Sequence, residues 1–151
     1  MERSVTHSTF MIERSYPATP QRVFNAFSDP AKKRRWFAEG EESKLEEYEA
    51  DFRVGGSERT RFRFNDGPAC TNNTAYLDIQ PNSRIVFVYT MTLGDHRFSS
   101  SQATVEFFPT ATGTSMIFTE QAAFFERSDG PQIREQGWRL LFEQLAHELA
   151  R

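Results

Sequence analysis

Large apolar and polar residues alternate along most of the chain between residues 9 and 120. A period of two is typical of half-buried β-strands, because successive side chains of a strand point to opposite faces of a sheet. Fifteen phenylalanines occur among the 151 residues, and many of them occupy alternate positions of these segments. The pattern therefore predicts one sheet with a bulky aromatic face. The predicted strands cover residues 9–16, 48–54, 60–64, 74–79, 85–91, 103–107 and 116–120.

Two short helices and one long helix are predicted from start signals and from helical spacing. Thr19 with Pro20, and Asp29 with Pro30, each place an N-cap residue before a proline suited to the first helical position. Between residues 132 and 149, apolar residues recur at spacings of three and four, which predicts a helix with one apolar stripe. The stripe consists of Trp138, Leu141, Phe142, Leu145 and Leu149. A polar, solvated loop is predicted for residues 38–49.

The order of these elements predicts an α+β fold in a single domain of residues 1–151. We expect a curved antiparallel sheet of about seven strands, two short helices after the first strand, and a long C-terminal helix across the aromatic face. A helix is only about 10 Å wide, so a cavity is predicted between it and the sheet. Because an empty apolar void costs on the order of 24 cal/mol per Å³, this cavity must be small, wet or occupied.

Charge and composition exclude several classes of protein. A formal net charge of −3 argues against a nucleic-acid partner. Without a long apolar run or a secretory signal, we expect a cytoplasmic protein that does not insert into membranes, as a monomer or a homodimer. Cys70 is the only cysteine, and the three histidines have no metal-ligand spacing, so no disulfide, metal site or cofactor is expected. The basic run 32–35 is interpreted as solvated surface.

Glu120 is the one residue that the pattern singles out for chemistry. It falls on the apolar parity of the last predicted strand, and a buried carboxylate must be paired, hydrogen-bonded or protonated. Arg14 has the inward parity on the first strand, so an Arg14–Glu120 ion pair that fixes two strands is one interpretation. The other is a pocket group that binds the polar end of a ligand, with the Tyr89 hydroxyl beside it. Glu120 and Tyr89 are therefore the catalytic candidates, with Glu120 as general base.

Most of the other inward-facing residues are expected to line the ligand cavity. They are bulky and apolar, which suits a site with few polar groups. The predicted ligand-binding residues are Trp36, Phe52, Phe62, Phe64, Phe87, Tyr89, Met91, Phe107, Phe118, Glu120, Trp138 and Phe142.

Several segments together resemble the SRPBCC superfamily, which has the helix-grip fold of birch-pollen-allergen-like and START proteins. The segments are residues 16–24, 29–30, 35–37, 51–56, 79–81, 84–87, 119–121 and 137–138. Within this superfamily the chain is similar to the C-terminal domain of heat-shock-protein ATPase activators, a branch with many small bacterial homologues. The resemblance implies a helix-grip fold over nearly the whole chain.

The resemblance also implies a set of alternative functions. The leading hypothesis is a carrier that binds a small hydrophobic molecule between sheet and helix, in a bacterial stress or metabolic context. The alternatives are a cyclase- or aromatase-like enzyme acting on an aromatic or polyketide-like substrate, and a protein-interaction or co-chaperone-like module. The enzyme alternative is the less favoured, since no catalytic signature of the related branches can be placed on this chain.

Overall fold

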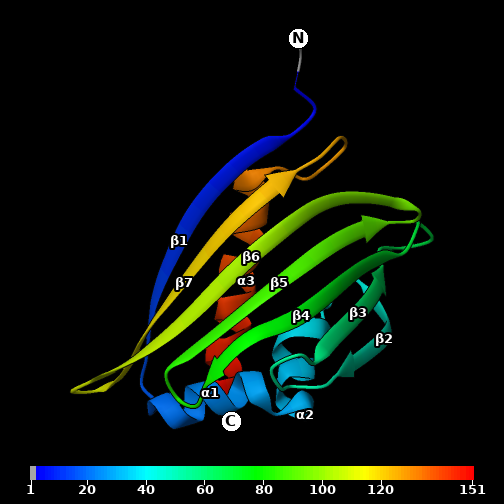
Figure 1. Ribbon diagram of the computed structural model, residues 1–151. Helices are drawn as coiled ribbons and strands as arrows, with labels where there is room; N and C mark the ends of the chain where they lie inside the picture. Colours follow the sequence, from blue (N-terminus) through cyan, green and yellow to red (C-terminus); the bar gives the residue numbers. More distant parts are fainter. Residues whose placement is uncertain (1–2) are drawn as a thin grey trace.

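The computed structural model describes residues 3–151 and shows an α+β molecule (Figure 1). Its helical segments are α1 (Pro20–Ser28), α2 (Pro30–Lys33), a π-helical turn η1 (Arg34–Ala38) and α3 (Pro131–Leu149). Its strands are β1 (Thr6–Tyr16), β2 (Lys44–Ala50), β3 (Ser57–Arg63), β4 (Cys70–Gln80), β5 (Arg84–Leu93), β6 (His96–Thr110) and β7 (Gly113–Phe124). The predicted fold class and the order of the elements are confirmed.

The seven strands form one antiparallel sheet in the order β1-β7-β6-β5-β4-β3-β2. The sheet curves around α3, and α1 and α2 lie together at the end of the molecule where α3 finishes (Figure 1). Along β7, Met116, Phe118 and Glu120 are buried, whereas the residues between them are partly exposed. The alternation in the sequence thus separates a face toward α3 from a face toward solvent. Among the described residues, no helix is long and apolar enough to cross a membrane.

The two short helices begin at the predicted residues. Thr19 Oγ1 accepts a hydrogen bond from the Arg22 backbone N–H at 3.2 Å, and Asp29 Oδ1 accepts one from Ala31 at 2.9 Å. Each side chain thereby satisfies a backbone donor that the first helical turn leaves free. After α2 the chain continues directly into the wider π-helical turn η1. The Trp36 indole within η1 donates to the Ala26 carbonyl at 2.8 Å, which fastens the turn to α1.

The predictions for residues 38–54 are partly wrong. The edge strand β2 already begins at Lys44, within the predicted loop, while Phe52 and Val54, expected in a strand, lie in the connection to β3. The charges that suggested a loop are paired across the two strands: Glu46 binds Arg61 and Arg63 at 3.2 and 3.0 Å. A polar strand is stable at this edge because its carboxylates face the arginines of its neighbour.

The core consists mainly of aromatic rings from the sheet and from α3. Trp138 and Phe142 of the predicted stripe are buried, and their ring centroids lie 5.5 Å apart. The Phe118 ring lies 4.6 Å from that of Trp138. Stacked and tilted ring contacts of this kind add about 0.5–1.5 kcal/mol per pair beyond the buried area. The prediction that α3 packs its apolar stripe against the aromatic face is confirmed.

Candidate functional site

Glu120 lies at the centre of a buried polar network between the sheet and the first half of α3. Its side chain is fully buried. Oε1 accepts a hydrogen bond from the Tyr89 hydroxyl at 2.7 Å, and Oε2 accepts one from Ser101 Oγ at 3.1 Å. Arg134 Nη1 lies 3.6 Å from Oε2. The inward position of Glu120 and its proximity to Tyr89, both predicted, are confirmed.

The Tyr89 hydroxyl joins this network to α3. It accepts hydrogen bonds from Arg134 Nη1 and Trp138 Nε1, each at 3.1 Å, while it donates to Glu120. Arg134 also binds Asp129 at 2.9 Å. Burial raises the pKa of Glu120, although the Tyr89 hydrogen bond and the Arg134 charge oppose the rise. Burial likewise raises the pKa of Tyr89, which stays protonated as a donor.

The ion pair between Arg14 and Glu120, one of the two interpretations of Glu120, does not form. In the register of β1 and β7, Arg14 lies opposite Met116, whereas Glu120 lies opposite Phe10. Four strand residues correspond to about 13 Å, which is too far for an ion pair. Arg14 instead binds Glu143 of α3 at 2.7 Å. Shared parity identified the face of the sheet correctly but did not determine the register.

A second buried polar cluster joins α2 to the sheet, and sequence reasoning missed it. Lys33 Nζ lies 3.0 and 3.2 Å from the two carboxylate oxygens of Glu58, and the two residues are 6% and 4% exposed. The hydroxyls of Tyr76 and Tyr48 donate to Glu58 Oε1 at 2.9 and 3.2 Å. Lys33 Nζ also lies 4.4 Å from the centre of the Phe37 ring, within the range of a cation–π contact.

The sequence carries a signal for this pair. Glu58 has the same parity as Thr60 on its strand, so the argument that singles out Glu120 also applies to Glu58. The interpretation of the basic run 32–35 as solvated surface is wrong for Lys33, which precedes Phe37 by four positions and shares its helical face. A charged residue on an apolar face is as informative in a helix as it is in a strand.

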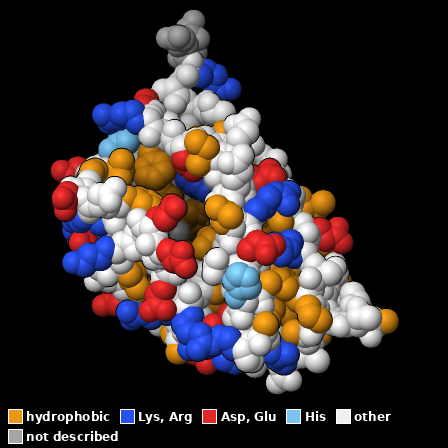
Figure 2. Space-filling view, turned by 180° about the vertical axis from the view of Figure 1, so that it is seen from behind, with side chains coloured by type: hydrophobic (Ala, Val, Ile, Leu, Met, Phe, Trp, Pro, Cys, Tyr) orange, Lys and Arg blue, Asp and Glu red, His pale blue; other side chains and the backbone are white. Residues whose placement is uncertain are grey.

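A small pocket opens beside the Lys33–Glu58 pair, between η1, β3–β5 and α3. We call it the Lys33 pocket; its volume is about 10 Å³, room for about one water molecule. Of the three states expected for the cavity between helix and sheet, the structure has the small one, because aromatic side chains fill most of that space. Figure 2 shows that the surface on the α3 side is nevertheless hollowed, with hydrophobic side chains inside the hollow. The pocket is lined by Lys33, Phe37, Glu58, Asn72, Thr74, Tyr76, Phe87 and Trp138.

Of the predicted ligand-binding residues, Phe87 and Trp138 line this pocket. Tyr89 and Glu120 belong to the neighbouring network instead. Phe64 is 53% exposed and forms an edge contact with Phe62, with 5.5 Å between ring centroids. The others pack within or against the core, namely Trp36, Phe52, Met91, Phe107, Phe118 and Phe142.

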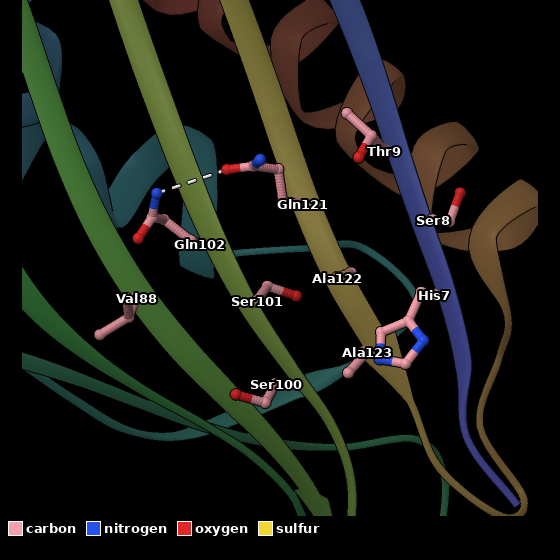
Figure 3. A pocket seen from close by; sticks show the side chains of 10 residues that line it. All are labelled: His7, Ser8, Thr9, Val88, Ser100, Ser101, Gln102, Gln121, Ala122 and Ala123. Atoms are coloured by element: carbon pink, nitrogen blue, oxygen red, sulfur yellow. Dashed lines mark hydrogen bonds between the residues drawn. The ribbon is translucent and has the colours of Figure 1, made fainter.

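The outer face of the sheet holds a larger depression that lacks comparable chemistry. It is open to solvent, measures about 590 Å³, and crosses β1, β7, β6 and β5 (Figure 3). Gln102 and Gln121 bind each other across its floor at 3.4 Å. Volume alone favours this depression, but the buried charges and aromatic walls favour the Lys33 pocket. The outer depression is lined by His7, Ser8, Thr9, Val88, Ser100, Ser101, Gln102, Gln121, Ala122 and Ala123.

Comparison with solved structures gives similarity over the whole chain. An uncharacterized protein from Rhizobium leguminosarum is 40% identical with a TM-score of 0.94, covering 100% of this chain and 99% of its own. The Mll3558 protein from Rhizobium loti is 47% identical with a TM-score of 0.90, covering 97% and 99%. An AHSA1-like protein from Aeromonas hydrophila shares the fold at 19% identity and a TM-score of 0.70, covering 95% and 92%.

Comparison with protein families gives a match over most of the chain, whereas a search of curated proteins found no match. The matching family is described as "Activator of Hsp90 ATPase homolog 1-like protein", and it matches residues 17–150. This span runs from the end of β1 to the end of α3 and includes both buried polar clusters. The chain therefore belongs to the activator of Hsp90 ATPase homolog 1-like family, within the SRPBCC superfamily of helix-grip proteins.

Proposed function

We propose that this protein binds a small, largely apolar molecule between the sheet and α3, and that the Lys33 pocket anchors it. The observation that carries the proposal is the buried Lys33–Glu58 pair at the wall of a pocket whose other walls include Phe37, Phe87 and Trp138. Desolvating two charges often costs as much as their attraction returns. An ion pair that is buried from solvent but borders a small aromatic pocket is therefore better suited to recognising a ligand than to stabilising the fold.

Phe37 occupies the position that a ligand ring would take. Its ring covers Lys33 Nζ at 4.4 Å and lies 5.9 Å from the Trp138 ring, yet Phe37 is only partly buried. It belongs to η1, and single π-helical turns are frequent at functional sites. Outward rotation of this side chain would add the space of one aromatic ring to the pocket. A cavity of about 150 Å³ is enough to admit benzene in another protein.

The proposal is tested by comparing toluene binding to the wild type, to Phe37→Ala and to Phe108→Ala. Phe108 is 45% exposed at the far end of β6, so it is a matched control. We expect toluene to shift the amide and indole NMR signals of pocket residues in the wild type. Phe37→Ala should bind toluene more tightly, because no side chain has to be displaced. Phe108→Ala should match the wild type.

Absence of pocket shifts in both the wild type and Phe37→Ala would refute the proposal. Equal affinity of the two proteins would instead remove the role given to Phe37. The cyclase-like alternative receives less support. Its candidates Glu120 and Tyr89 are outside the residues that line the pocket, and their oxygens already bind Ser101, Arg134 and Trp138.

A further inference from the structure

We propose that the Lys33 pocket selects an uncharged aromatic molecule that carries a hydrogen-bond acceptor, such as an aryl ketone, aldehyde or ester. This inference rests on the proposed function and adds the chemical class of the ligand. It follows from the charge balance of the pocket wall, from the hydrogen-bond donors left over there, and from the ring that now covers Lys33.

The charges of the pocket wall already cancel. Lys33 is the cation and Glu58 the anion among the lining residues, and both carboxylate oxygens accept from the same ammonium group. An anionic ligand would have to take Lys33 from Glu58 or lie next to the Glu58 charge. A cationic ligand would have to take Glu58 from Lys33 or lie next to the Lys33 charge. Because both charges are buried, neither rearrangement could be offset by water, so the wall favours a neutral molecule.

The unused hydrogen-bonding capacity of the wall consists chiefly of donors. Asn72 Oδ1 accepts from Thr74 Oγ1 at 2.8 Å, and within residues 3–151 the N–H groups of Asn72 donate to no protein group but are not buried away from solvent, so they are free to donate to a ligand. Lys33 has three N–H groups and gives two of them to Glu58, while Phe37 covers the ammonium group. Tyr76 already donates to Glu58. A ligand that brings an acceptor oxygen would satisfy Asn72, or Lys33 once Phe37 has moved.

The ring of the ligand would replace the ring of Phe37. That ring makes the cation–π contact with Lys33 and a tilted contact with Trp138, and a ligand ring in its place would restore both. Asn72 and Thr74 stand on the sheet side of the same pocket. An acceptor attached to the ring would therefore point toward β4. One substituted aromatic ring accounts for the apolar and the polar walls together.

Four probes of similar size separate the possible ligand classes: acetophenone, ethylbenzene, benzoate and benzylammonium. Each is titrated into the wild-type protein and into Phe37→Ala, and the dissociation constant is taken from the NMR shifts of the Trp138 indole N–H and the pocket amides. We expect acetophenone to bind about fivefold more tightly than ethylbenzene, the worth of one neutral hydrogen bond. Both charged probes should bind more weakly than acetophenone.

The outcomes distinguish this inference from the proposed function. Equal or tighter binding of ethylbenzene would overturn the acceptor requirement and leave the proposed function standing. Tightest binding of benzoate or benzylammonium would overturn the choice of a neutral ligand. If none of the four probes shifts a pocket signal in the wild type or in Phe37→Ala, the proposed function fails and this inference fails with it.

Two asparagines side by side in β4 provide a matched pair of variants. Asn72 is buried and lines the pocket, whereas Asn73 is exposed on the outer face. Asn72→Leu should bind acetophenone and ethylbenzene almost equally, and its ethylbenzene affinity shows whether the pocket is still folded. Asn73→Leu should keep the wild-type preference. A preference that survives in Asn72→Leu would overturn the role of Asn72 as the donor to the ligand.

Discussion

At the scale of single residues, the two most deeply buried carboxylates differ in how their charges are compensated. Glu58 is matched directly by Lys33, whereas Glu120 relies on the hydroxyls of Tyr89 and Ser101 and on a longer approach of Arg134. A buried carboxylate without a close cation holds its charge less readily. The two positions should therefore respond differently to substitution.

Glu120→Gln tests the balance at Glu120. Burial raises the pKa of Glu120 above its ordinary value of 4.5 in the folded protein, so the folded state binds this proton more tightly than the unfolded state. The contribution of Glu120 to stability is therefore greatest at low pH and declines as the pH rises through the folded-state pKa. We expect the wild type to lose stability relative to Glu120→Gln as the pH rises from the ordinary pKa of 4.5 to the raised pKa of the folded state. Urea unfolding at a series of pH values measures this difference, and a pH-independent difference would contradict the raised pKa.

Lys33→Met tests the buried ion pair. Removal of the ammonium group leaves the Glu58 carboxylate buried without its cation, which should lower the free energy of unfolding by about 3–5 kcal/mol. The double variant Lys33→Met with Glu58→Gln should recover most of that loss, because the stranded charge is gone. Chemical denaturation of the two variants and the wild type provides the comparison. A double variant as unstable as the single one would show that packing, rather than charge, is responsible.

At the scale of elements, α3 covers the inner face of the sheet with the apolar stripe that the sequence predicted. Phe142 is fully buried in this stripe, whereas Leu140, two positions earlier, is 68% exposed. Phe142→Ala should destabilise the protein by about 3–5 kcal/mol through loss of buried surface and creation of a cavity. Leu140→Ala should change stability by no more than about 0.5 kcal/mol. Thermal or urea unfolding of this pair checks the assignment of the faces, and similar losses in both variants would contradict it.

Two glycines show how much the surrounding element determines the effect of an added methyl group. Gly137 lies exposed within α3, and a Cβ added there would meet no other atom within 4 Å, so Gly137→Ala should stabilise the helix by about 0.5–1 kcal/mol. Gly113 begins β7 with φ of +157°, and a Cβ there would overlap the Tyr16 carbonyl oxygen. Gly113→Ala should therefore lower the melting temperature, whereas Gly137→Ala raises it. Melting curves with the opposite order would contradict this account.

At the scale of the whole molecule, the sequence predicted the architecture better than it predicted the empty space. Alternation and helical spacing report which face each residue occupies, and they placed Glu120, Tyr89 and the α3 stripe correctly. They carry no information on register, so they could not decide whether Arg14 pairs with Glu120, and Arg14 binds Glu143 instead. They also cannot measure how closely rings from different elements interlock. Contacts of the Trp138 ring with Phe87 and Phe118 fill most of the volume between α3 and the sheet in which the cavity was expected.

The way the elements pack also predicts which part of the molecule unfolds locally most often. The segment α2–η1 consists of two short helical pieces at the rim of the sheet, whereas β5, β6 and β7 are long strands paired on both sides. Amide hydrogens of residues 34–38 should therefore exchange with solvent faster than those of the central strands or the middle of α3. Hydrogen exchange followed by NMR measures this order. Equal protection of η1 and the central strands would argue against a movable Phe37.

A pocket closed by the protein's own side chain has a kinetic consequence. If a ligand enters only after the Phe37 ring has rotated outward, the observed association rate should first rise with ligand concentration. It should then level off at the rate of that rotation. The apparent affinity for the ligand would likewise be reduced in proportion to the small fraction of molecules in which the Phe37 ring is rotated outward. Phe37, which fills the space in the unliganded protein, would then determine both the association rate and the affinity of the ligand.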